Sequence, residues 1–97
     1  MKISHLGIGS VEIRSSEASL PALLRLIQRI EGTTVTDIVN KPWRNEVSAA
    51  IRYKDALMTL EVPFSDFIIS CSPPFGAFDE FTSKLAAYQM KWWERLF

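Results

Sequence analysis

Residues 46–64 constrain the fold more than any other part of the chain, because apolar and polar side chains alternate along two arms that a short turn separates. The apolar positions of the two arms are Val47, Ala49, Ile51 and Tyr53, and then Met58, Leu60, Val62 and Phe64. A period of two is typical of a strand with one buried face, so this stretch predicts an antiparallel hairpin.

A single register of this hairpin places every large apolar side chain of that set on one face. The predicted pairs are Tyr53 with Met58, Ile51 with Leu60, Ala49 with Val62 and Val47 with Phe64, and on the other face Arg52 with Thr59 and Ala50 with Glu61. The turn lies at Asp55-Ala56. Because this pair is not a favoured two-residue turn, the alternative is a loop that is one or two residues longer.

A helix with one apolar face precedes the hairpin, in the stretch SSEASLPALLRLIQRIEG. Ser16 or Ser19 can cap its N-terminus, with Pro21 in the first turn if Ser19 is the cap. Gly32 is a natural stop. Before this helix, residues 2–14 read as one bent strand or two short ones, since Gly7 and Gly9 break the alternation.

Three further elements complete the predicted order. The β-branched stretch at 33–39 reads as a strand, 66–71 as a short strand, and a final helix runs from about Ala77 to the end. The predicted order is β-α-β-β-β-α, with one more strand if every short strand is counted. Together with a hairpin that is polar on one face, this order predicts a single α+β domain over residues 1–97. We expect a two-layer sandwich with an antiparallel sheet of about four strands and two helices on one face.

The final helix carries more apolar surface than one contact with a sheet requires. One predicted stripe contains Phe78, Phe81, Leu85, Tyr88, Trp92 and Leu96, and a second contains Ala86, Met90, Trp93 and Phe97. We expect Met90, Trp93 and Phe97 to bind another protein chain, since aromatic residues and methionine are enriched at interface centres. The alternative is that this second stripe packs against the first helix; both hold if Met90 is internal and the others are exposed.

A second candidate surface is the predicted loop NKPWRN, which contains Trp43 and Arg44. Tryptophan and arginine are the residue types most often found as interface hot spots. The alternative is that Trp43 folds back over the edge of the core while Arg44 is only solvated.

Little in the sequence points to chemistry, a metal or a cofactor. His5 is the only histidine, and Cys71 is in phase with core residues, so neither is expected to be catalytic or to bind metal. With 11 basic and 11 acidic residues, no basic stripe is available for nucleic acid. No apolar run is long enough for a membrane span or a signal peptide, and a single cysteine suits the cytoplasm.

We therefore expect a non-enzymatic cytoplasmic protein that acts through protein–protein contact, as a homodimer or with a partner. One alternative is nucleic-acid binding, because the order from Leu20 to Phe97 is similar to that of double-stranded-RNA-binding domains. Such domains carry lysines at the start of their second helix, where this chain has Asp79 and Glu80, and carboxylates repel phosphates. The other alternative is a small enzyme with a site near His5.

Overall fold

The computed structural model describes residues 1–89, which form one sheet with two α-helices packed on it. The elements are β1 (Ser4–Gly7), β2 (Ser10–Ile13), α1 (Leu20–Arg29), β3 (Thr33–Lys41), the 3-10 helix η1 (Pro42–Arg44), β4 (Glu46–Tyr53), β5 (Ala56–Glu61), β6 (Phe67–Cys71) and α2 (Gly76–Ala87).

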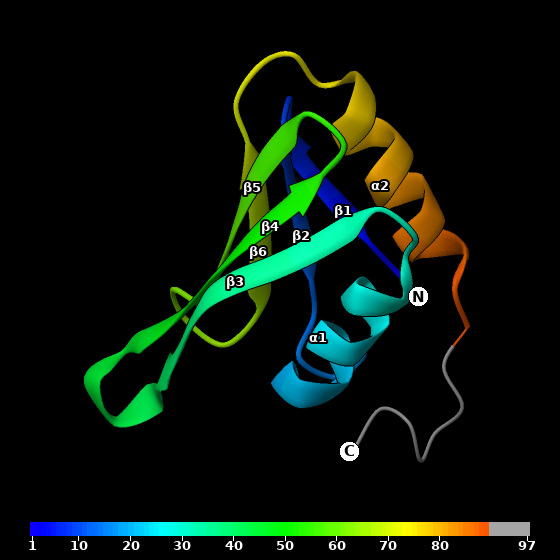
Figure 1. Cartoon of the computed structure of the whole chain (residues 1–97). Coiled ribbons are helices and arrows are strands. Elements are labelled where there is room, and N and C mark those ends of the chain that lie inside the picture. The colour runs from blue at the N-terminus through cyan, green and yellow to red at the C-terminus, as the bar shows by residue number, and fades with distance from the viewer. Residues whose placement is uncertain (90–97) are drawn as a thin grey trace.

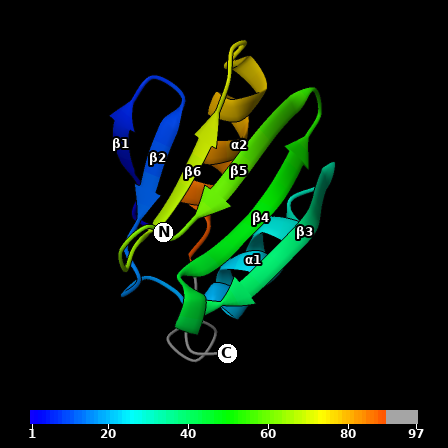
Figure 2. The same ribbon diagram turned by 90° about the vertical axis from the view of Figure 1, so that its left-hand side faces the viewer.

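All neighbouring strands are antiparallel, in the spatial order β1-β2-β6-β5-β4-β3. Both helices lie on the same face of the sheet (Figure 1). The view in Figure 2 looks onto the opposite face, with the helices behind the strands. The predicted α+β class is confirmed, but the sheet has six strands rather than about four. Residues 2–14 form two strands, and β6 joins β2 to β5 in the middle of the sheet.

The turn between β1 and β2 depends on glycine. Gly9 has φ +76°, a conformation that residues with a side chain rarely adopt. A Cβ at this position would also lie 2.7 Å from the carbonyl oxygen of Cys71, in β6. The chain can therefore reverse here and still pack tightly against its neighbour, which turns the predicted bend into two strands.

Helix α1 forms as its apolar spacing predicts, and Ser19 rather than Ser16 is its N-cap. The Ser19 hydroxyl accepts a hydrogen bond from the backbone N–H of Ala22 at 3.3 Å. The inward side chains Leu23, Leu26 and Ile27 are buried in the core between helix and sheet.

The β4–β5 hairpin has the predicted faces but a different register. Tyr53 pairs with Ala56 and Ile51 with Met58, two residues away from the predicted pairs. A shift of two preserves the faces, because side chains alternate with a period of two. The turn is therefore only two residues long, and its first residue, Lys54, has φ +54°.

The corrected register ends β5 at Glu61, earlier than the alternation suggested. The prediction that Phe64 lies on the buried face was wrong, because Phe64 falls in the β5–β6 loop and is exposed.

Strand β3 is longer than predicted and lies at one edge of the sheet. It continues to Lys41, and Figure 1 shows the β3–β4 ribbon extending away from the helices. Asp37, with φ +52°, and Ile38 stand opposite the single residue Ala49, between the pairs Thr36–Ala50 and Val39–Ser48. This β-bulge interrupts the edge of the sheet.

Helix α2 buries Phe78, Phe81 and Leu85, as the first predicted stripe required, whereas Tyr88 of that stripe lies outside the helix. The prediction that this helix continues to the end of the chain was wrong, since it ends at Ala87 and Tyr88 is extended. There the Tyr88 hydroxyl accepts a hydrogen bond from Arg29 Nη1 at 2.7 Å, and its carbonyl oxygen accepts one from the N-terminal ammonium. These contacts hold Tyr88 outside the helix.

Candidate protein-binding surfaces

The tip of the molecule, where η1 joins β3 to β4, presents Trp43 to solvent. Pro42 begins η1, and Asn45, with φ +55°, turns the chain back into β4. Asparagine tolerates this left-handed conformation better than most residues. The Trp43 side chain between them is 77% exposed, and Arg44 is exposed as well. Trp43 therefore does not fold back over the core edge.

A hollow of about 330 Å³ lies beside this tip, and we call it the tip hollow. Its lining comes from β3, the start of β4 and the end of β5, namely Val39, Asn45, Glu46, Val47, Ser48, Glu61, Val62 and Pro63. Its floor and walls are thus partly apolar, with two carboxylates among them.

Phe64 directly follows Pro63, the last of the lining residues on this segment. Its side chain is 95% exposed. Trp43 stands two residues before Asn45, the first lining residue on the other segment that leads into β4. Two large aromatic side chains therefore belong to the two segments that enclose one hollow. Phe64 was not a candidate from the sequence, because the alternation assigned this residue to the buried face of the hairpin.

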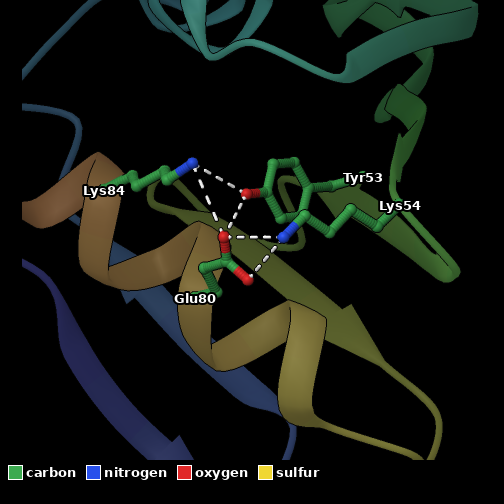
Figure 3. Close-up of polar contacts among 4 residues, drawn as sticks. All are labelled: Tyr53, Lys54, Glu80 and Lys84. Carbon is green, nitrogen blue, oxygen red and sulfur yellow. Dashed lines mark hydrogen bonds and ion pairs between the residues drawn. The ribbon is translucent and has the colours of Figure 1, made fainter.

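A polar cluster ties the β4–β5 turn to α2 (Figure 3). The buried Tyr53 hydroxyl donates a hydrogen bond to Glu80 Oε1 at 2.8 Å and accepts one from Lys84 Nζ at 2.9 Å. Lys54 Nζ donates to both carboxylate oxygens of Glu80 at 2.9 Å. We call these four residues the Glu80 cluster.

The contacts of the cluster shift the protonation of its charged groups. The hydrogen bond from Lys54, followed by the one from Tyr53, lowers the pKa of Glu80 to about 2. The hydrogen bond to Glu80 raises the pKa of Lys54, and that to Tyr53 raises the pKa of Lys84. All three charged groups stay ionised at neutral pH, so the cluster acts as a fixed tie and not as a proton-transfer centre.

The face of the sheet that the helices leave uncovered, which we call the outer face, is ordered in three rows across the strands. The Arg52 row contains Thr34, Arg52 and Leu57; the middle row contains Thr36, Ala50, Thr59, Ser70 and Ser10; the Glu61 row contains Val39, Ser48, Glu61, Ile68 and Glu12. The middle row consists of small side chains, and a hydrogen bond of 3.4 Å joins the Ser10 and Ser70 hydroxyls within it.

The outer face is hollowed over β3, β4 and β5. A hollow of about 440 Å³ is lined there mainly by Thr34, Thr36, Ala50, Arg52, Leu57 and Thr59. Leu57 beside it is 66% exposed. This residue was the sequence signal that could have indicated the surface, because it is apolar in the outward phase of the hairpin.

The candidates for chemistry are dispersed in the structure. His5 is exposed on β1, opposite Val11. Cys71, at the end of β6, has a pKa that burial raises, and its thiol donates to the carbonyl oxygen of Ser72. Over residues 1–89, no three histidine, cysteine or acidic side chains gather as metal ligands would.

The three remaining predicted binding residues, Met90, Trp93 and Phe97, lie outside the described residues. Within residues 1–89, no helix has the length and apolarity that a membrane crossing needs. The chain matches no known family model, no curated protein and no solved structure.

Proposed function

We propose that this protein is non-enzymatic and acts by binding another protein, with Trp43 on η1 and Phe64 in the β5–β6 loop as its anchors. The observation that carries the proposal is the exposure of these two rings, 77% and 95%, on the two segments that enclose the tip hollow. Exposed large apolar side chains gathered at one place mark interaction sites, and tryptophan is prominent among interface hot spots.

The lining of the tip hollow indicates the chemistry of the bound segment. Val39, Val47 and Val62 favour an apolar side chain inside it. Glu46 and Glu61 at its walls favour a lysine or arginine beside that side chain. The partner, a second copy or a different protein, therefore contributes an apolar side chain next to a basic one.

The end of the chain remains a second predicted anchor in this proposal. Met90, Trp93 and Phe97 are the residue types found at interface centres. The two anchors are tested separately.

Nucleic-acid binding is less favoured than protein binding. The first turns of α2 present Asp79 to solvent, and the carboxylate of Glu80 follows it. Lys54 and Lys84, which lie beside Glu80, are engaged with Glu80 and Tyr53. A phosphate approaching this helix would meet the Asp79 and Glu80 carboxylates, which repel it, while both lysines are already engaged.

Photo-crosslinking in the cells that produce the protein tests the proposal. A photoreactive phenylalanine analogue replaces Trp43 in one variant and Phe64 in another, and Gln28, exposed on α1, in the control. We expect both tip positions to form the same specific covalent adduct, with this chain or with one other protein, and the control to form none. Adducts no stronger at the tip than at position 28 would overturn the proposal.

A further inference from the structure

We infer that the outer face of the sheet binds a second copy of this chain about a two-fold axis, with Arg52 of each copy against Glu61 of the other. This inference goes beyond the proposed function, because it names the occupant of the outer face, which shares Val39, Ser48 and Glu61 with the lining of the tip hollow. It stands on the placement of charge and of exposed apolar area on the outer face.

The charges of the outer face are separated along the strands. Arg52 lies in one outer row and Glu61 in the other, with the middle row between them. Along β4, Arg52 is four residues from Ser48, the residue opposite Glu61, which corresponds to about 13 Å. The two charges are therefore too far apart to pair with each other within one copy.

A two-fold axis parallel to the middle row makes this pattern self-complementary. Such an axis places the Arg52 row of one copy over the Glu61 row of the other, and the reverse contact follows from the symmetry. Because a two-fold rotation involves no shift along its axis, Arg52 lies over Ser48 of the other copy and Leu57 over Glu61. Glu61 and Ile68 are each one strand further along, about 5 Å away, which is within reach of the Arg52 and Leu57 side chains. One arrangement thus satisfies two ion pairs and two apolar contacts.

The middle rows determine how closely the two sheets can approach. Ala50, Thr59 and Ser70 lie at the centre of this row, and they are small enough for the two faces to meet without large side chains between them. Sheets that stack face to face are ordinarily about 10 Å apart. Leu57, 66% exposed in the single chain, loses its contact with water in this arrangement.

The net charge of the chain is compatible with self-association. Its 11 basic and 11 acidic side chains leave no overall repulsion between two copies. A partner other than a second copy would need its own pair of opposite charges at the same spacing, whereas a second copy carries that pair by symmetry.

Charge reversal tests the inference with the full chain. Sedimentation velocity over a concentration series should show a dimer for the wild type. The dimer should be at least about 100-fold weaker for Arg52→Glu and for Glu61→Arg, because each substitution creates two repulsive contacts.

The decisive sample is an equimolar mixture of these two variants. We expect it to form a heterodimer with two restored ion pairs. In one pair, the glutamate introduced at position 52 of one copy meets the arginine introduced at position 61 of the other. In the second pair, the native Glu61 of the first variant meets the native Arg52 of the second.

The double variant R52E/E61R should likewise recover the dimer, and Arg25→Glu on the exposed side of α1 should keep it. A wild type that stays monomeric at about 1 mM, or a mixture that sediments no faster than its components, would overturn the inference. Photo-crosslinking at position 43 in the Arg52→Glu background separates the two proposals: a persistent adduct there leaves tip binding intact whatever the fate of the dimer.

Discussion

Single residues in unusual backbone conformations determine where this chain turns. Gly9, Asp37, Asn45 and Lys54 all have positive φ, and each stands at a turn or a bulge of the sheet. Glycine takes this conformation at little cost, and asparagine and aspartate tolerate it better than lysine does, but it is uncommon for all three. The other three positions are the ones that sequence patterns identify least well.

Gly9→Ala should destabilise the protein strongly. Its Cβ would meet the carbonyl oxygen of Cys71 and the Phe75 ring, on a backbone with φ +76°. We expect a loss of roughly 2–4 kcal/mol in the free energy of unfolding, measured by urea denaturation. Gly76→Ala is the matched control, since a Cβ at the start of α2 meets nothing within 4 Å. That variant should be neutral or up to about 1 kcal/mol more stable; equal effects of the two substitutions would contradict the role of Gly9.

At the scale of elements, alternation predicted which side chains of the β4–β5 hairpin face the core, but not how its strands are aligned. Two registers that differ by two residues bury the same face, so the pattern cannot distinguish them. The difference lies in the turn, where Lys54 takes a left-handed conformation that its side chain does not signal. Phe64 moved from the predicted core to the surface for this reason.

The candidate surfaces were predictable to a similar extent. Trp43 was identified by residue type, and only the structure establishes that it is exposed. The tip hollow was not predictable, because it forms where β3, β4 and the end of β5 meet, and that meeting depends on the register. The extent of α2 was overestimated because the apolar spacing continues beyond Ala87, whereas Tyr88 is held by contacts with Arg29 and the N-terminus.

The Glu80 cluster, which connects the β4–β5 turn to α2, should make the free energy of unfolding depend on pH. The pKa of Glu80 is about 2 in the folded chain, against 4.5 for an unperturbed carboxyl. Its stabilising contribution is therefore fully present above about pH 4.5 and is lost as the pH falls toward 2. We expect Glu80→Gln to lower the urea midpoint at neutral pH, and this difference from the wild type to shrink as the pH falls from about 5 to about 2.

The effect should be modest, because the Glu80 side chain is 41% exposed and water screens its ion pairs. Asp79→Asn, which removes the neighbouring exposed carboxylate of α2, should leave the pH dependence of the wild type unchanged. A Glu80→Gln variant whose urea midpoint differs from that of the wild type equally at all pH values would contradict this role of the Glu80 carboxylate.

At the scale of the whole molecule, the sandwich has one covered and one uncovered face, and within residues 1–89 the exposed Trp43 and Phe64 lie on the two segments that line the tip hollow. The two helices cover one face of the sheet, and the core between them includes Ile51, Leu60 and Phe81. The outer face and the tip then contribute little to this core, so their side chains can be chosen for contact with other molecules. This separation is what allows binding variants to be tested without unfolding the protein.

The terminal anchor can be tested in the same way. Trp93→Ala combined with Phe97→Ala should weaken association at least about tenfold, since a truncated hot spot costs about 2 kcal/mol or more. Sedimentation or titration against the crosslinked partner measures this loss, and the thermal midpoint should stay that of the wild type. A large drop in the midpoint would instead place these side chains in the core.

The bulge on β3 limits how far any such assembly can grow. A long, regular strand at the margin of a sheet invites copy after copy to add its own strand, which ends in fibres. Asp37 and Ile38 interrupt the regular pairing in the middle of this edge strand, and the Asp37 carboxylate lies at the interruption. Copies of this chain should therefore form closed oligomers of a fixed size, which do not aggregate at high protein concentration.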